Sequence, residues 1–265
     1  MKKLIILLLV FGFSCAIVPL TGRKQFAFIP LEQMMSLSAD SYSQVLKESK
    51  LSTNQKYNTS VRNVGQNVTV AVRQYLRNNK MEAAIEGYQW QYNVIVSEEL
   101  NAWCMPGGQI AFYEGIMPVC QDDNGVAVVM GHEIAHAIAR HGNERMSQQL
   151  VIQMGGMALT EAIKSQKETT QQLALLAFGV GSTLGVILPY SRTHESEADE
   201  MGLYFMAMAG YDPRAAPALW ERMLAKSGGA RPPEFLSTHP DPANRINNLN
   251  RIMPKAMEYY RASQK

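Results

Sequence analysis

The feature that most constrains this chain is the pattern H-E-x-x-H, formed by His132, Glu133 and His136. Asp122 to Asn124 precede it as candidate helix caps and Gly142 follows as a stop signal, so we expect the pattern to lie mid-helix. Residues four apart on a helix differ by about 40° around its axis, so both histidines face one side. Together they can bind one zinc ion, but a catalytic zinc site usually needs a third protein ligand.

His141 is the nearest further histidine, but helical geometry argues against it as the third ligand. It lies nine residues after His132, which is about 180° around the helix at 100° per residue. We expect His141 to interact with the last carbonyls of the helix or to contact a loop. The longer metzincin motif also fails, because Ala139 and Gly142 stand where it needs glycine and histidine.

The remaining candidate ligands lie downstream in the sequence HESEAD, which offers His194, Glu195, Glu197 and Asp199. Glu195 and Asp199 are four apart and share one face of a helix. One carboxylate of such a pair can bind zinc, while the other accepts a hydrogen bond from the non-metal nitrogen of a ligand histidine. The alternative is a solvated acidic helix face, the usual meaning of this spacing. The upstream H-E-x-x-H favours the metal site.

Length, composition and charge are those of an ordinary globular protein. The chain has 265 residues, 46% of them hydrophobic, enough for one domain with a sizeable core. A net charge of +2 gives no support to nucleic-acid binding. We expect an α+β fold that is mainly helical with a small sheet. The expected helices cover Ser38–Met81, a stretch closed by Gly210, Ala215–Lys226 and Pro242–Tyr260, and the expected strands cover Trp90–Val96 and Gln109–Tyr113.

The segment from Gly155 to Leu188 is rich in alanine, glycine and leucine. A membrane-spanning helix is conceivable there, but the uncharged run is short and holds three glycines. We expect a buried helix, or a mobile helical hairpin beside the active site.

The N-terminus reads MKKLIILLLVFGFSC: two lysines, an apolar run, then small residues and Cys15. This layout is typical of a secretory signal, and Cys15 predicts lipidation, although Gly12 departs from the usual pattern. An ordinary cleaved signal or an uncleaved anchor are the alternatives. We expect a signal over residues 1–15, a linker or docking segment over 16–37, and one domain over 38–265. In an exported protein, Cys104 and Cys120 form a disulfide or remain buried thiols.

Three ordered motifs carry a family resemblance: NAWCMPGGQIAFYEGI, HEIAHAIARHGNERMS and SRTHESEADEMGLYFMAMAGYDP. They resemble the gluzincin metalloendopeptidases of the HtpX and CAAX prenyl protease (Ste-type) family, with the exported bacterial lipoproteins as the nearest branch. The likeness runs from about Thr21 to Ile246. It implies a zincin-like domain with H-E-x-x-H on the active-site helix. It also implies one Zn²⁺ per chain, held by His132, His136 and Glu195, with Glu133 catalytic and Asp199 supporting the ligands.

The resemblance also places His239, in STHPDPANRI, near the metal. His239 then either supports the oxyanion of the reaction or binds zinc as a fourth ligand in a resting state. The alternative is a loop histidine that caps the next helix. We expect no fixed ligand role for His194. No tetratricopeptide module is expected after the peptidase region.

The function implied is zinc-dependent hydrolysis of unfolded or damaged cell-envelope proteins, as protein quality control. A polypeptide substrate would pair with Gln109–Tyr113 or Asn101–Met105 by strand addition. The alternative function is an envelope chaperone or assembly factor with little proteolytic activity, but Glu133 and a full ligand set favour the enzyme. We expect the protein on the periplasmic side of a bacterial envelope, lipid-anchored to the outer membrane surface.

Overall fold

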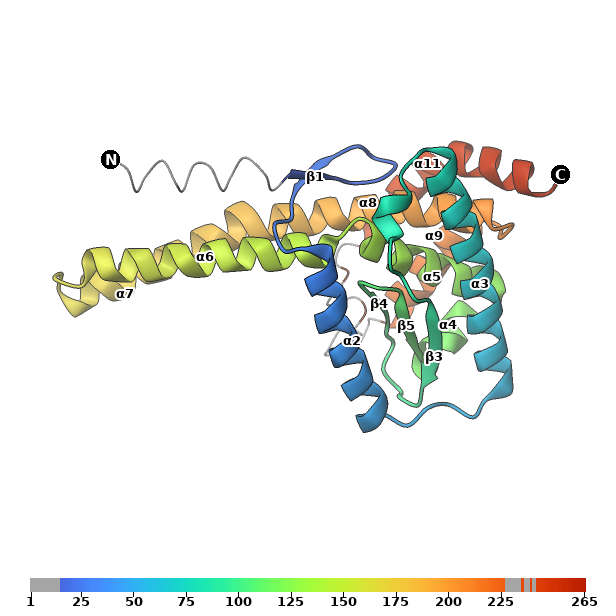
Figure 1. Ribbon diagram of the computed structural model, residues 1–265, viewed down its shortest axis with the longest axis horizontal. Coiled ribbons are helices and arrows are strands. Elements are labelled where there is room, and N and C mark those ends of the chain that lie inside the picture. Colours follow the sequence, from blue (N-terminus) through green and yellow to red (C-terminus); the bar gives the residue numbers. More distant parts are fainter. Residues whose placement is uncertain (1–14, 227–234, 236–238, 240–241) are drawn as a thin grey trace.

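The computed structural model describes residues 15–226, 235, 239 and 242–265. It consists of a body that surrounds a small sheet and a long helical hairpin that projects from it (Figure 1). The expected signal segment lies outside the described residues except for Cys15. Strands β1 (Cys15–Ile17) and β2 (Lys24–Phe26) pair antiparallel and form an N-terminal hairpin.

The sequence predicted helical structure over Ser38–Met81, and the structure has two separate helices in this region. They are α2 (Leu31–Glu48), which begins inside the expected linker, and α3 (Gln55–Asn78). The Asn54 side chain caps α3 by accepting a hydrogen bond from the Tyr57 backbone N–H at 3.3 Å. The inward face of α3 carries apolar residues at helical spacing, namely Val61, Val64, Val68, Val72 and Leu76.

The three-stranded sheet has the order β3-β5-β4, with bounds Gln91–Ile95 for β3, Ala102–Met105 for β4 and Gln109–Tyr113 for β5. Strand β5 runs parallel to β3 and antiparallel to β4. The predicted turn at Pro106–Gly108 joins β4 to β5, and its two glycines have φ angles of +103° and +92°. Because β5 is paired on both sides, the prediction that it receives a substrate strand is wrong. Strand β4 lies at the edge of the described sheet.

Helix α5 (Asp123–Ile138) lies in the core and crosses α8 (Leu188–Met208). The predicted cap is confirmed, since Asp122 accepts a hydrogen bond from the Gly125 N–H at 2.9 Å. Two glycines allow the crossing to be close: a Cβ on Gly202 would lie 2.7 Å from the His132 backbone nitrogen. The predicted stop at Gly142 is wrong. Instead Arg140 adopts a left-handed φ of +56°, and the next helix already begins at the residue after it.

The remaining body elements complete the core around Trp220 and Phe205. They are η1 (Glu82–Ile85), η2 (Glu114–Ile116), α4 (Met117–Cys120), α9 (Ala215–Lys226) and α11 (Pro242–Ser263). The boundaries predicted for α9 are confirmed, and α11 runs three residues past its predicted end at Tyr260. Cys104 and Cys120 are free thiols, so the disulfide alternative is wrong.

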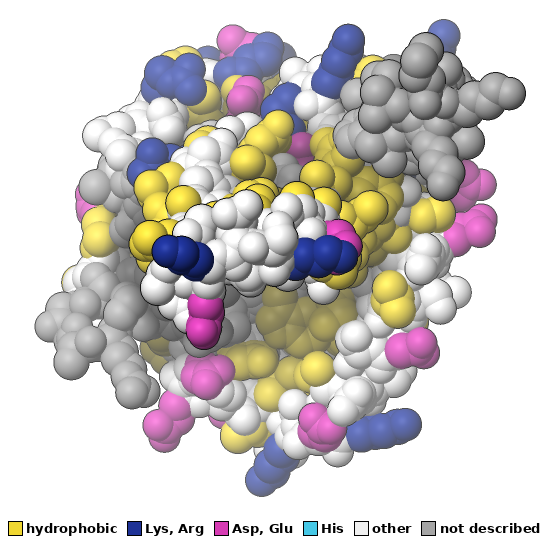
Figure 2. All heavy atoms as spheres, turned by 90° about the vertical axis from the view of Figure 1, so that its left-hand side faces the viewer, with side chains coloured by type: hydrophobic (Ala, Val, Ile, Leu, Met, Phe, Trp, Pro, Cys, Tyr) yellow, Lys and Arg dark blue, Asp and Glu magenta, His cyan; other side chains and the backbone are white. Residues whose placement is uncertain are grey.

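The projecting hairpin, here called the arm, comprises residues 149–190. It is built from α6 (His141–Ile163), α7 (Glu168–Ser182), the π-helical turn η3 (Thr183–Ile187) and the start of α8. No residue of the arm is buried, so the expected buried helix is wrong and the arm is a helical hairpin. Figure 2 views it end-on, with charged side chains at the tip and hydrophobic ones behind. By length and composition alone, the helix Glu168–Met208 could cross a membrane.

Candidate metal centre

Four ligand-type side chains converge at the α5–α8 crossing. His132 and His136 come from α5, Glu195 from α8, and His239 from the chain before α11. One ligand atom from each lies within 4.8 Å of all the others, and all four residues are buried. The structure thus brings together residues that the sequence separates by up to 107 positions.

The nitrogen and oxygen atoms in this cluster point at a common centre. His132 Nε2 lies 3.0 Å from His136 Nε2 and 3.4 Å from Glu195 Oε2. His136 Nε2 lies 3.5 Å from Glu195 Oε1. His239 Nδ1 lies 3.0 Å from Glu195 Oε2 and 3.1 Å from His132 Nε2. His239 therefore lies in the same donor cluster as the three predicted ligands.

The donor set fits a zinc ion. Asp199 Oδ1 lies 3.2 Å from His132 Nδ1, so a proton on that nitrogen leaves Nε2 free to bind a metal. His136 Nδ1 lies 2.9 Å from His141 Nδ1, outside the donor cluster, so His136 also presents Nε2 to the centre. Two imidazole nitrogens 3.0 Å apart, beside the Glu195 carboxylate, are placed to share one cation. Two histidines and a glutamate are an established set for catalytic zinc.

Asp199 is held by a buried arginine. Arg245 donates from Nε to Asp199 Oδ2 at 2.8 Å and from Nη2 to Oδ1 at 2.5 Å, and its guanidinium lies 3.6 Å from the centre of the Trp220 ring. Burial raises the pKa of Asp199, but Arg245 outweighs it and lowers the pKa. Burial and Arg245 lower the pKa of His132, yet Asp199 and Glu195 prevail and raise it to about 9. A bound cation needs the lone pair of Nε2, so metal binding and protonation compete at His132.

Glu133 occupies the cleft side of this cluster. It is buried, and its Oε1 has no hydrogen-bond partner among the described residues. His239 Nε2 lies 3.5 Å from that oxygen. Burial is the main cause of a raised pKa for Glu133, against the lowering effect of His239 and His132. A carboxylate with a raised pKa and a free oxygen suits proton transfer.

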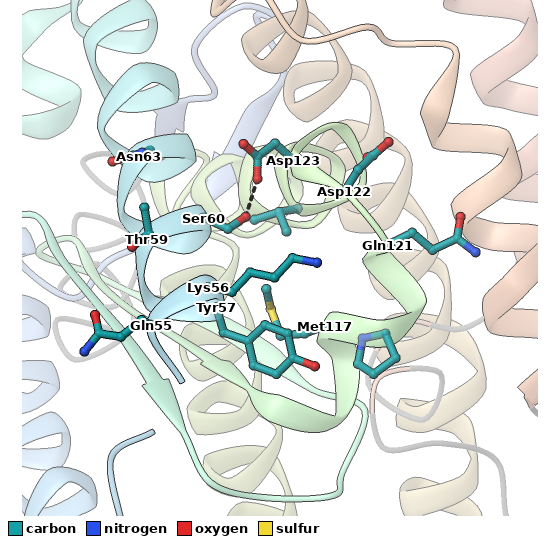
Figure 3. Close-up of a pocket in the computed structure, with 12 residues that line it drawn as sticks. Gln55, Lys56, Tyr57, Thr59, Ser60, Asn63, Met117, Gln121, Asp122 and Asp123 are labelled. Carbon is teal, nitrogen blue, oxygen red and sulfur yellow. Dashed lines mark hydrogen bonds between the residues drawn. The ribbon is translucent and has the colours of Figure 1, made fainter. Parts of the chain in front are cut away.

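A cleft of about 300 Å³ opens onto Glu133, His136 and His239, with β4 along one wall. A larger pocket of about 750 Å³ lies elsewhere, between the start of α3 and the start of α5 (Figure 3). Its labelled residues include Lys56, Ser60 and Asp123, and its lining contains no histidine or cysteine. The chemistry therefore belongs to the smaller cleft.

Sequence reasoning missed a set of residues that lies behind His136. His141 is not a helix-end or loop contact: its Nδ1 lies 2.9 Å from His136 Nδ1. The phase argument assumed one continuous helix, but the left-handed backbone at Arg140 ends α5 and turns His141 back toward the site. His194 is not part of the donor cluster, and its Nε2 lies 2.8 Å from Glu144 Oε2. No local spacing in the sequence signals either contact.

An H-E-x-x-H helix crossed by a second helix that carries a glutamate is typical of one group of zinc metallopeptidases. The sequence pattern of Peptidase family M48 matches residues 66–253. The chain belongs to this family, whose members depend on zinc.

Curated relatives agree with this assignment. The chain is 31% identical to the mitochondrial metalloendopeptidase OMA1 of Schizosaccharomyces pombe, over 90% of this chain and 66% of that protein. It is 30% identical to the mitochondrial metalloendopeptidase OMA1 of Homo sapiens, over 96% of this chain and 49% of that protein. It is 27% identical to the β-barrel assembly-enhancing protease of Escherichia coli, over 64% of this chain and 36% of that protein. The chain thus spans about one third to two thirds of the length of these relatives.

These relatives overturn the predicted location. The OMA1 relatives are mitochondrial proteins, which contradicts a lipoprotein anchored to the bacterial outer membrane. A basic and then apolar N-terminus is a targeting pattern that does not itself specify the compartment, and the cysteine at its end misled the interpretation. The prediction of a zinc metalloendopeptidase family is confirmed, whereas the HtpX and CAAX prenyl protease (Ste-type) assignment and its exported lipoprotein branch are not supported.

Proposed function

We propose that this protein is a zinc-dependent endopeptidase that cleaves unfolded or damaged polypeptides as part of protein quality control. The observation that carries the proposal is the Glu133 carboxylate. It is buried, its Oε1 lacks a hydrogen-bond partner among the described residues, and it lies between the histidine and glutamate cluster and the cleft. A chaperone that only binds polypeptides gains nothing from a buried carboxylate whose Oε1 accepts no hydrogen bond among the described residues.

His132, His136 and Glu195 would hold the zinc ion, with Asp199 fixing the ring orientation of His132. Bound zinc supplies a water molecule whose pKa is lowered to about 7. Glu133 would accept the proton of that water and pass it to the leaving amine. The position of His239 Nδ1 within the donor cluster supports a fourth-ligand role in a resting state over oxyanion support.

The edge of β4 is the proposed site for the substrate backbone. Tyr113 donates its N–H to the Asn101 carbonyl at 3.0 Å, so by antiparallel alternation Ala102 and Cys104 turn their backbone groups away from β5. The Ala102 N–H bonds the side chain of Asn101 at 2.9 Å instead of another strand. The Cys104 N–H and both carbonyls thus face the free edge of β4, and Ala102 and Cys104 both line the cleft. Backbone pairing reads little side-chain identity, which suits unfolded substrates.

The first experiment measures casein cleavage and zinc content for wild type, Glu133→Gln and Glu258→Gln. We expect Glu133→Gln to keep zinc and to lose activity by about 100-fold or more, because a general base is removed. Glu258 is exposed and lies on α11, so Glu258→Gln should match wild type. Full activity of Glu133→Gln would rule out the proposed role and would favour the chaperone alternative.

A second experiment tests pairing with β4. In a set of substrate peptides, one backbone amide at a time is replaced by an ester, which removes the N–H donor but keeps the chain length. Strand addition predicts that every second replacement raises KM, while those between have little effect. A uniform response along the peptide would exclude pairing at this edge.

A further inference from the structure

Five polar side chains meet where the N-terminal hairpin, α6 and α8 converge. We call them the root cluster; its members are Arg23, His141, Glu144, His194 and Glu197. All except half-buried Arg23 are fully buried. The root cluster lies on the side of His136 opposite the other ligands, and the proposed reaction does not itself use it.

The root cluster reaches the metal site through one hydrogen-bond relay. If His136 binds zinc through Nε2, its Nδ1 must carry the proton and donate it to His141 Nδ1, 2.9 Å away. His141 then carries its own proton on Nε2, which donates to Glu197 Oε2 at 3.1 Å. Each ring has one tautomer that satisfies every contact, so the relay fixes the orientation of His136.

The end of the relay is held by the N-terminal hairpin. Glu197 accepts hydrogen bonds from Thr21 Oγ1 at 2.7 Å and from Arg23 Nε at 2.8 Å. Arg23 also donates to both carboxylate oxygens of Glu144, at 2.7 and 3.1 Å. Arg23 of the hairpin therefore forms ion pairs with both α6, through Glu144, and α8, through Glu197.

The His141 ring is also supported from its face. His194 stacks on it with a centroid distance of 4.3 Å and an interplanar angle of 17°. Glu144 accepts a hydrogen bond from His194 Nε2 at 2.8 Å and so holds that ring in place. The hydrogen bond to Glu197 thus fixes the rotation of the His141 ring within its plane, and His194 packs against the face of the ring.

We propose that His141 is a positioning residue for the metal ligand His136, and that Arg23 of the N-terminal hairpin acts on the same ligand through Glu197. The N-terminal hairpin then helps to orient a metal ligand, which goes beyond the linker role expected from the sequence. A displacement of the hairpin loosens the hold on zinc. This inference rests on the ligand set of the proposed function.

The test measures the rate of zinc release to a chromophoric chelator and the visible spectrum of the Co²⁺-loaded protein. Asparagine and leucine have similar size, but only the asparagine oxygen can replace His141 Nδ1 as an acceptor. We expect His141→Leu to release zinc about 10–100-fold faster and to alter the Co²⁺ spectrum. His141→Asn should keep the wild-type spectrum and release zinc more slowly than His141→Leu. Equal behaviour of the two variants would overturn the proposal.

Arg23→Gln tests the outer part of the relay, and it carries the test alone if His141→Leu does not fold. Its matched control is Asn143→Ala, because Asn143 joins the same N-terminal segment to α6 by donating to the Ile29 carbonyl at 2.7 Å. Among the described residues, its side chain forms no hydrogen bond to a member of the relay. We expect faster zinc release from Arg23→Gln and normal release from Asn143→Ala. Equal acceleration in both would mean general loosening and would overturn the proposal.

His136→Ala separates this inference from the ligand set on which it rests. Loss of zinc from His136→Ala is expected, and zinc retention would overturn the ligand set and the inference together. Zinc loss from His136→Ala combined with wild-type release from both His141→Leu and Arg23→Gln would overturn the inference alone.

Discussion

In the body, the side chains buried at the α5–α8 crossing are charged, whereas in the arm the side chains that face outward are apolar. Glu133, Asp199 and Arg245 are almost fully buried, while Leu173 and Leu176 are 67% and 64% exposed. Burying charge and exposing leucine are both unfavourable unless something else contacts them. The first region has paired charges and a donor cluster that fits the zinc ion on which the family depends. The second region has no covering surface among the described residues.

The two regions also differ in how tightly their backbones pack. At Gly202 in the body an added Cβ would meet the backbone of α5 at 2.7 Å, whereas at Gly179 in the arm nothing lies within 4 Å. The same helix, continuous from Glu168 to Met208, passes through both environments. Substitutions along it should therefore have opposite consequences in the two regions.

The largest expected effect comes from Arg245→Leu. It leaves the buried carboxylates of Asp199 and Glu195 without their arginine partner, which costs about 3–5 kcal/mol. Urea unfolding of the metal-free protein measures this loss. Arg214→Leu is the control, because Arg214 pairs with Asp212 at the surface, where an ion pair contributes little to stability. Similar losses for both variants would show that the body does not depend on its buried charges.

The next effect is a change in acid stability in Arg23→Gln. Burial raises the pKa of Glu144, but His194 and Arg23 outweigh it and lower the pKa to about 2 from the usual 4.5. This lowered pKa means that Glu144 stabilises the fold above about pH 4.5 and loses that contribution as the pH falls toward 2. We expect Arg23→Gln to cost roughly 2 kcal/mol at pH 7 and less near pH 3. Unfolding curves across this range check it, and a pH-independent loss would contradict it.

Gly202→Ala and Gly179→Ala should change stability with opposite signs. At Gly202 the added methyl group forces α8 away from His132, which costs about 1–3 kcal/mol and should weaken zinc binding. At Gly179 the methyl group enters open space within α7, and alanine stabilises a helix interior by roughly 0.5–1 kcal/mol. Thermal unfolding of both variants measures the signs. Two losses would mean that the arm packs against something at Gly179.

Local sequence spacing predicted the parts of the site that lie within one helix. H-E-x-x-H places His132 and His136 on one face, and Glu195 and Asp199 share a face four residues apart. The contact of Arg23 with Glu144 joins residues 121 positions apart, and no periodicity encodes it. His141 was misassigned because a single left-handed residue changed the helix axis.

For the arm, the predicted helical hairpin is confirmed, and the alternative of a buried helix is wrong for a different reason. Its alanine and leucine content was interpreted as burial, but apolar composition indicates only that a segment prefers an apolar neighbour and not that the same chain provides one. The edge position of β4 also could not be predicted, because strand order depends on long-range pairing that the alternation of each strand does not specify.

The smallest expected effect is on stability when Leu173, Leu176 and Leu184 are each replaced by glutamine. These side chains are exposed, so each change should alter the free energy of unfolding by less than about 0.5 kcal/mol and leave zinc release unchanged. The fluorescence of a dye that binds hydrophobic surfaces should fall, because the exposed apolar area shrinks. Leu203→Gln is the control in the buried part of the same helix and should cost about 2–5 kcal/mol. A comparable loss in the arm variants would mean that the arm is covered by another part of the protein.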